Sequence, residues 1–547
     1  FAIANLFIQA AINRFGSDAI AGVINVITEH PKDPVNVQSK TRVGGESSFS
    51  QNANVDLNLG KFTSSTSYQR RQMGGWQLSP YELDGDTAIL SKREASSRFY
   101  SNIVNQHFTY SPTKQLKLYA QGGYFDRKVI RPVEKTKNDG GYTYDLTYMD
   151  YNIGAGGRYQ LNETDYLSLD FYVDNYEYNK LYTVAQVSKK DTTFRVGDEE
   201  LTKRQKYYNA NLKGVFKLGN YNKISLGTEY TNDYMKNPGN LEKPEGIYTL
   251  AIYAQDEIRL WKNLQILPGF RYVYNEMFKN SFTPKIALMY TLGNFNFRAS
   301  YAAGFKTPSI QELYYDYENR GAITVGNPDL KPEKANYYNI NVEYAGKYLN
   351  ISANGYINDV KDIIEKYDIG ATDEEKANGI KTHNMYQNLD KASIKGFDIS
   401  ANSYLGAGFS AAGSYNCVYA ADDSGHRLSE SVRHAATFRA GWSHEWNKYT
   451  LRANVNGRIQ GSKYIYKKTT DKKTGEDIYT DVSAPKYQLW NFATTHTFAP
   501  VGNFLFEINA GIDNLFDWTD DRPSGVNYAT LNPGRTLFAS LIIRFTK

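Results

Sequence analysis

Long stretches of the chain alternate between apolar and polar residues with a period of two. In segment 449–461 the odd positions are small or apolar and the even ones hydrophilic: Leu451, Ala453, Val455, Gly457 and Ile459 against Arg452, Asn454, Asn456, Arg458 and Gln460. Side chains of a β-strand point alternately to its two faces, so this segment predicts a strand with one apolar and one hydrophilic face. Segments 116–124 and 167–174 repeat the pattern. The runs reach about ten to thirteen residues, the length that crosses a bilayer at a tilt.

Short polar turns divide the chain into hairpins. Ten can be identified, around residues 60–61, 111–114, 162–165, 219–222, 261–263, 293–294, 346–347, 406–408, 447–448 and 500–503. Longer charged loops rich in Tyr and Asp lie between them, such as 126–150, 178–203 and 305–334. Short turns at one end and long loops at the other are typical of an outer-membrane barrel. Ten turns imply eleven hairpins, so we predict an all-β fold, a transmembrane antiparallel β-barrel of about 22 strands.

Composition excludes several other classes of protein. The 547 residues include 46 Tyr and one Cys, with a net charge of +5 and a mean hydropathy of −0.58. No stretch of about 18 apolar residues occurs, which excludes a helical membrane protein. One Cys excludes a disulfide framework and Cys-based metal sites. The basic residues are spread along the chain, which argues against nucleic acid as a partner, and no catalytic motif such as HExxH or GxSxG indicates an enzyme.

The first 36 or so residues do not alternate. The run 23–27 is apolar apart from one Asn, which suits a buried strand in a small globular unit. Segment 30–34 contains two prolines and is expected to be a linker. We therefore predict a small unit with its linker at residues 1–36 and the barrel at residues 37–547. A strand number near 22 is associated with barrels whose lumen is plugged.

Several motifs resemble the TonB-dependent outer-membrane receptors. Segment 15–28, FGSDAIAGVINVIT, resembles the end of the plug domain of that family, with a motif formed by Gly16, Ser17, Asp18, Gly22 and Asn25. GFKTP at 304–308 and GNPDLKPE at 326–333 resemble its paired FRAP and NPDL boxes, and segments 356–364, 388–398, 511–517 and 535–545 resemble its late strands. Members carry a signal peptide, a TonB box and most of the plug ahead of this point. We therefore expect the sequence to be a piece of a longer chain.

The resemblance implies a receptor that imports a scarce metal chelate, either haem or a ferric siderophore, across the outer membrane of a Gram-negative bacterium. Cobalamin is the alternative cargo within the family, and no intrinsic cofactor or metal is expected. The expected partners are a TonB-type energy-coupling protein, lipopolysaccharide and outer-membrane lipid, and a surface lipoprotein that delivers the ligand. Lysine pairs at 189–190, 467–468 and 472–473 lie in external loops, where they could contact lipopolysaccharide. A passive porin and a surface adhesin are alternatives of another class, although the plug-like segment argues against a porin.

Candidate ligand residues gather in the loop 305–334 and near residue 384. The set comprises Tyr314, Tyr315, Asp316, Tyr317, Arg320, Asn327, Asp329, His383 and Met385. Exposed aromatic residues beside charges of both signs are typical anchors of a binding surface. The two boxes have a competing structural role, because X-Pro and Asn-Pro restrict the backbone. Haem iron commonly takes His, Tyr or Met ligands, which makes His383 the candidate haem ligand. In haem receptors of the family a histidine is expected between the two boxes, and none occurs here.

Overall fold

The computed structural model describes residues 32–77, 81–84, 87–90, 94–133, 142–187, 193–319, 321–428, 430–470, 477–520 and 532–547. The plug-like motif therefore lies outside the described residues, as does most of the predicted N-terminal unit at 1–36. Arg320 also falls outside them.

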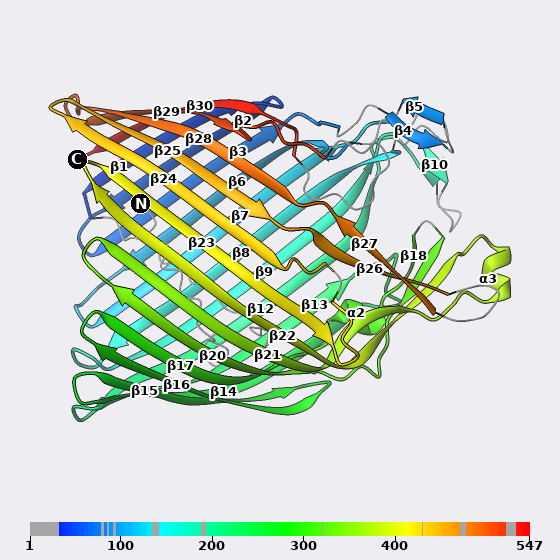
Figure 1. Ribbon diagram of the computed structural model, residues 1–547, viewed down its shortest axis with the longest axis horizontal. Coiled ribbons are helices and arrows are strands. Elements are labelled where there is room, and N and C mark those ends of the chain that lie inside the picture. The colour runs from blue at the N-terminus through cyan, green and yellow to red at the C-terminus, as the bar shows by residue number, and fades with distance from the viewer. Residues whose placement is uncertain are drawn as a thin grey trace.

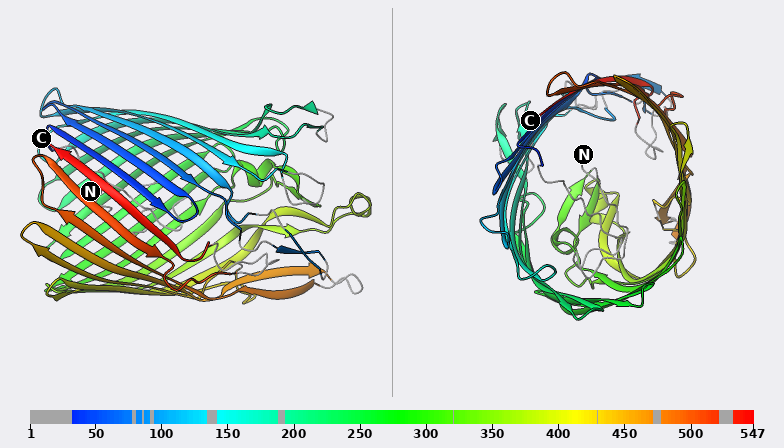
Figure 2. Two further views of the ribbon diagram at one scale, coloured as in Figure 1. Left: turned by 90° about the horizontal axis from the view of Figure 1, so that it is seen from above. Right: turned by 90° about the vertical axis from the view of Figure 1, so that its left-hand side faces the viewer.

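Twenty-two antiparallel strands form one closed barrel, which confirms the predicted fold class and strand number (Figures 1 and 2). The barrel closes where the first strand pairs with the last, from Asn36 opposite Thr546 to Gly44 opposite Phe538. Its strands are β1 (Val35–Gly44), β2 (Ser48–Asn58), β3 (Phe62–Met73), β6 (Arg98–Tyr110), β7 (Leu116–Ile130), β8 (Tyr144–Gln160), β9 (Tyr166–Tyr182), β12 (Glu199–Leu218), β13 (Asn222–Lys236), β14 (Glu245–Leu260), β15 (Leu264–Asn275), β16 (Lys279–Leu292), β17 (Phe295–Lys306), β20 (Glu333–Ala345), β21 (Leu349–Asp368), β22 (Thr382–Gly406), β23 (Phe409–Asp422), β24 (His434–Trp446), β25 (Tyr449–Gln460), β28 (Tyr487–Phe498), β29 (Phe504–Asp513) and β30 (Thr536–Thr546).

The remaining elements lie in the long connections. They are β4 (Tyr81–Asp84), β5 (Thr87–Leu90), β10 (Gln186–Val187), β11 (Thr193–Phe194), α2 (Ile310–Tyr314), β18 (Asp316–Asn319), β19 (Ala322–Val325), α3 (Asp373–Ala377), β26 (Lys463–Thr470) and β27 (Asp477–Ala484). Neither described helix is long and apolar enough to cross a membrane. The segment around α2 lies inside the outline of the barrel when the molecule is viewed along its length (Figure 2, right).

All ten predicted turns join neighbouring barrel strands, and they lie together at the end of the barrel that carries the C-terminus (Figure 1). The long connections gather at the other end, which is the extracellular end in barrels of this kind. The predicted loops 126–150 and 178–203 are too wide, because β7 continues to Ile130 and β9 to Tyr182. Strand pairing therefore continues beyond the part of each strand that alternates apolar and polar residues.

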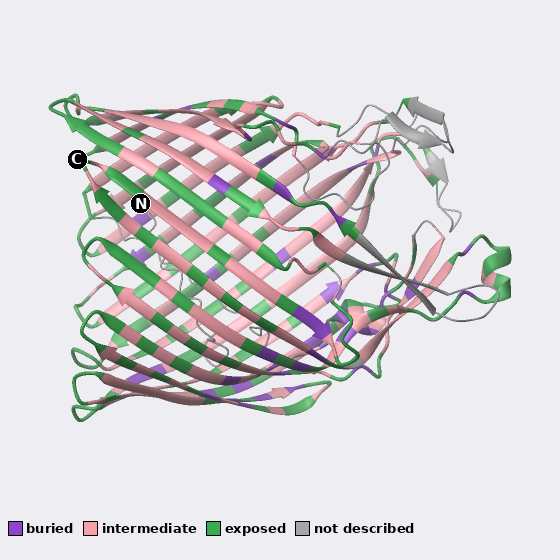
Figure 3. Ribbon diagram, viewed as in Figure 1, coloured by how far each residue is buried: buried purple, intermediate pink, exposed green. Residues whose placement is uncertain are grey.

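The alternation assigns the two faces of the wall, and exposure follows it along many strands (Figure 3). On β9 the odd positions Leu167, Leu169, Phe171 and Val173 are exposed apolar residues that face the lipid. The even positions of β9 face the lumen, together with the residues opposite them on β8 and β12. This parity locates every side chain discussed below.

Candidate functional site

The loop between β17 and β20 begins with a short capped helix. Ser309 is the N-cap of α2, and its hydroxyl accepts a hydrogen bond from the backbone NH of Glu312. The Glu312 carboxylate in turn accepts from the backbone NH of Ser309 at 2.7 Å. This reciprocal capping box satisfies two NH groups that a helix start would otherwise leave unpaired, so it fixes where the chain turns into the helix.

Tyr315 follows α2 and lies inside a hydrophobic cluster. Its side chain is only 5 % exposed, and its hydroxyl accepts a hydrogen bond from Asn237 Nδ2 at 3.0 Å and contacts Met235 Sδ at 3.2 Å. Burial raises the pKa of the Tyr315 phenol. The buried members of the cluster come from the loop, from β13, β14 and β21, and from the connection between β13 and β14: Met235, Leu241, Ile247, Ile310, Leu313, Tyr315, Leu330 and Ile364. In this packing the Tyr315 ring presents no free face to a ligand.

The neighbouring candidates lie at the edge of the same cluster. Tyr314 and Tyr317 are partly buried against it, and the ring of Tyr317 meets that of Tyr315 edge to face at 6.3 Å. Burial also raises the pKa of the Tyr314 phenol. Asp316 is exposed, and its backbone NH donates to the carbonyl of Asn240. Residues 314–317 therefore all lie at or within this one cluster. A ligand role for Tyr314, Asp316 and Tyr317 stays a prediction.

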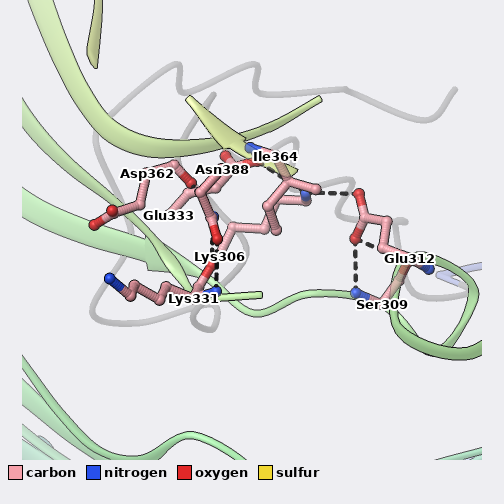
Figure 4. A network of polar contacts seen from close by, with 8 residues as sticks. All are labelled: Lys306, Ser309, Glu312, Lys331, Glu333, Asp362, Ile364 and Asn388. Carbon is pink, nitrogen blue, oxygen red and sulfur yellow. Dashed lines mark hydrogen bonds and ion pairs between the residues drawn. The ribbon is translucent and has the colours of Figure 1, made fainter. Parts of the chain in front are cut away.

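The two boxes meet in one network of charges at the base of the loop (Figure 4). Lys306, in the GFKTP segment, places its Nζ 3.2 Å from a carboxylate oxygen of Glu312 and 3.1 Å from one of Glu333. Glu333 ends the GNPDLKPE segment and also accepts a hydrogen bond from the backbone NH of Ile364 at 3.1 Å. One ammonium group thus joins the start of α2, the start of β20 and the neighbouring strand β21.

Side-chain hydrogen bonds connect the GNPDLKPE segment to the neighbouring strand β22. Asn327 donates from its side chain to the carbonyl of Tyr386 at 2.9 Å and accepts from the backbone NH of Asp329 at 2.9 Å. The side chain of Asn388 accepts from the NH of Lys331 at 2.8 Å and donates to its carbonyl at 2.9 Å. These bonds tie the segment to β22, so in this structure Asn327 and Asp329 shape the loop.

The segment at His383 and Met385 joins the same assembly. β19 pairs in parallel with the start of β22, with Ile323 opposite His383 and Val325 opposite Met385. His383 Nδ1 lies 2.9 Å from Glu375 of α3, and the His383 side chain is 20 % exposed. Nδ1 is therefore occupied by a carboxylate, and a haem role for His383 stays untested.

A second group of side chains, which the sequence analysis did not single out, lines the lumen near the extracellular end. The rings of Tyr148 and Tyr178 stack at 5.0 Å with an interplanar angle of 12°, and Tyr176 lies 6.5 Å from Tyr148. Tyr144 meets Tyr182 edge to face at 6.0 Å. All five occupy even positions of β8 and β9, which is the lumen-facing parity, and Tyr182 among them is buried beneath the ring of Phe194, which stacks on it at 4.3 Å. We call these five tyrosines the lumen wall.

Cations accompany the lumen wall. The Arg131 guanidinium lies 4.8 Å from the ring centre of Tyr144, and the ammonium groups of Lys180 and Lys203 lie 5.3 Å and 5.6 Å from the rings of Tyr144 and Tyr176. Lys180 is also paired with Glu200 at 3.1 Å. Aromatic faces attract cations through their quadrupole, so these side chains preorganise one another. Extending the alternation of 167–174 to residue 182 would have revealed this wall.

Comparison with known proteins identifies the family. Residues 75–515 match the model described as TonB dependent receptor-like, beta-barrel. The chain belongs to this family of TonB-dependent receptors. Membership confirms the recognition made from the motifs, the outer-membrane location and a receptor or transporter role without enzymatic activity. It also implies energy coupling through TonB.

The relatives that this chain resembles are named for different ligands. The vitamin B12 transporter of Photobacterium profundum is 23 % identical over 92 % of this chain and 73 % of its own length. The ferric enterobactin receptor of Pseudomonas aeruginosa is 24 % identical over 60 % of this chain, and the match spans about half (49 %) of that relative. A crystal structure of the latter superimposes with a TM-score of 0.78 at 16 % identity over 98 % of this chain and 84 % of that chain. The siderophore receptor PirA of Acinetobacter baumannii gives 0.76 at 16 % identity over 96 % and 82 %. At such identities the superpositions establish the fold alone.

Proposed function

We propose that this receptor imports an anionic metal chelate that carries aromatic groups, a ferric siderophore, and that the lumen wall binds it. The observation that carries the proposal is the stack of Tyr148 and Tyr178 together with the cations on neighbouring rings of the lumen wall. Arg131 and Lys180 lie by Tyr144, and Lys203 lies by Tyr176. Flat aromatic ligands gain about 0.5–1.5 kcal/mol per ring contact beyond area burial, and cations attract the charge of the chelate. A similar relative is named a ferric enterobactin receptor.

Binding of ferric enterobactin to purified receptor tests the proposal. The variant Tyr148→Ala/Tyr178→Ala removes two stacked rings, and we expect its affinity to fall at least about tenfold, roughly 1.4 kcal/mol. A matched control is Tyr124→Ala/Tyr151→Ala, because these two tyrosines also lie opposite each other on neighbouring strands but are exposed on the lipid side. Equal affinity of the lumen variant and the wild type would contradict the proposal.

Cobalamin is the second candidate cargo, favoured by the relative that is named a vitamin B12 transporter. Titration with cyanocobalamin and with haem beside ferric enterobactin distinguishes the three. Tight binding of cyanocobalamin without binding of ferric enterobactin would replace the siderophore with cobalamin. If the receptor binds haem and the His383→Ala variant does not, this result would support His383 as the haem ligand.

A transporter with a plug must also be closed to passive diffusion. In a liposome-swelling assay the receptor expressed with its complete N-terminal region should not pass small sugars, whereas a porin would. Rapid swelling would favour the channel alternative and contradict energy-driven import.

A further inference from the structure

Three lysines stand side by side on the lipid-facing side of β20, β21 and β22. Lys334 lies opposite Lys361, and Lys361 lies opposite Lys391 in the strand register. All three are exposed. Their face is identified by exposed apolar residues of the same parity along the three strands: Tyr338, Ile340, Ile357, Phe397 and Ile399. We call these three residues the lysine row.

The lysine row lies at the upper edge of the apolar band. On β21 the lipid-facing positions run from Leu349, where the strand begins, to Lys361, twelve residues further toward the extracellular end. Twelve residues at about 3.3 Å each, tilted by about 40°, rise about 30 Å, and the apolar band of such barrels is about 25 Å tall. The ammonium groups therefore lie at the level of the lipid headgroups. The next residues below them on this face are Asn336, Asp359 and Ser393, and Tyr338, Ile357 and Lys395 follow one step lower.

The charge pattern of the row favours an external anion, because like charges stand side by side. Cβ atoms of directly opposite residues are about 5 Å apart, and like charges in such pairs are destabilising. Elsewhere on the lipid-facing side a basic residue lies opposite an acidic one, as Arg204 does opposite Glu177, with an ion pair of 2.7 Å. In the lysine row, lysine faces lysine.

Among the described residues of β20, β21 and β22, one acidic side chain lies on this face directly beside the row. Asp359 is two residues before Lys361 on the same face, and its carboxylate accepts a hydrogen bond from the hydroxyl of Ser393 at 2.7 Å. A single carboxylate balances one of the three ammonium charges and leaves an excess of positive charge facing outward.

We propose that the lysine row binds the phosphate groups of lipopolysaccharide in the outer leaflet. Three ammonium groups at headgroup depth can converge on one phosphate, whose several oxygens accept from all of them. The acyl chains of the same lipid would lie against the apolar side chains below the row. The side of the barrel formed by β20, β21 and β22 also supports the loop that contains α2, so the bound lipid lies against the strands that carry this loop.

Binding of lipopolysaccharide to the receptor in phosphatidylcholine nanodiscs tests the proposal. The wild type should bind lipopolysaccharide, and Lys334→Gln/Lys361→Gln/Lys391→Gln should bind it at least about tenfold more weakly, since each lysine near an anionic surface contributes. The matched control Lys262→Gln/Lys347→Gln/Lys448→Gln makes the same change in charge at the short-turn end and should bind like the wild type. The single variant Lys361→Gln, at the centre of the row, should show a smaller loss and serves if the triple variant does not insert.

Two further ligands identify the source of the phosphate. Lipopolysaccharide from which the phosphates have been removed should bind the wild type as weakly as intact lipopolysaccharide binds the triple variant. Inorganic phosphate alone should not saturate the wild type at millimolar concentration. Equal binding of wild type and triple variant, or equal binding of the dephosphorylated lipid, would overturn the proposal. Tight saturable binding of inorganic phosphate would also overturn it, because the site would then serve a free anion.

Discussion

Replacement of Tyr315 should loosen the extracellular loop without affecting the barrel. The Tyr315→Phe variant removes the hydroxyl that accepts a hydrogen bond from Asn237 and contacts Met235. The Asn237 amide then loses its partner inside the cluster, which costs about 1–2 kcal/mol. Tyr315→Ala also removes a ring that is 5 % exposed, and truncation of a buried aromatic ring costs about 3–5 kcal/mol. Each substitution therefore lowers the free energy needed to open the loop by the amount given.

Hydrogen exchange of individual backbone amides measures this opening. The NH groups of Asp316, Gly326 and Asn327 donate to Asn240, Tyr315 and Glu312, so each exchanges only when the loop opens. We expect exchange about tenfold faster in Tyr315→Phe and about a hundredfold or more in Tyr315→Ala, since 1.4 kcal/mol corresponds to a factor of ten. Amides of β1 and β30 should be unchanged in both. Unchanged exchange of the loop amides in Tyr315→Ala would refute the reasoning, because it would mean that the cluster does not hold the loop.

Three further substitutions or conditions test the same assembly. Lys306→Met leaves the carboxylates of Glu312 and Glu333 without their shared cation, so a protease should cleave the loop roughly tenfold faster than in the wild type, and equal cleavage would contradict the network. Gly326→Ala should displace α2, since a Cβ there would lie 2.5 Å from the helix backbone, and an unchanged α2 in a crystal structure of the variant would refute this. The hydrogen bond from the N-cap NH of α3, together with the nearby imidazole, holds the pKa of Glu375 below its ordinary value of 4.5. The stabilisation of α3 should therefore be complete above about pH 4.5 and lost as the pH falls through the lowered value, which exchange of the α3 amides at graded pH would detect.

The barrel could be predicted because each strand is specified locally. A barrel strand has lipid on one side and a polar lumen on the other, so its residues alternate between apolar and polar. This alternation can be recognised within each strand's own sequence. The tight turns are equally local. The strand ends were less well predicted, since β21 and β22 continue for 20 and 25 residues. Beyond the bilayer both faces meet water, and the alternation that identifies a strand disappears there.

The packing of the candidate site could not be predicted for a different reason. The capping box of Ser309 and Glu312 is visible in the sequence, but the partners of Tyr315 are Met235 near the end of β13 and Asn237 just after it, about eighty residues earlier. A cluster of tyrosines and charges has the same composition whether the rings bind a ligand or fill a core. Only the contacts with Met235 and Asn237 show that Tyr315 fills a core.

The parallel pairing of β19 with β22 links the extracellular segment between β17 and β20 to the one between β21 and β22. Ala322–Val325 pair with the first residues of β22, and β22 is also paired with β21, the strand that leads into α3. A movement that lifts the α2 segment away from the lumen must therefore either break this ladder or carry the hairpin of β21 and β22 with it. As long as this ladder persists, the two extracellular segments move together, and a crosslink between residues 324 and 384 should leave that motion intact.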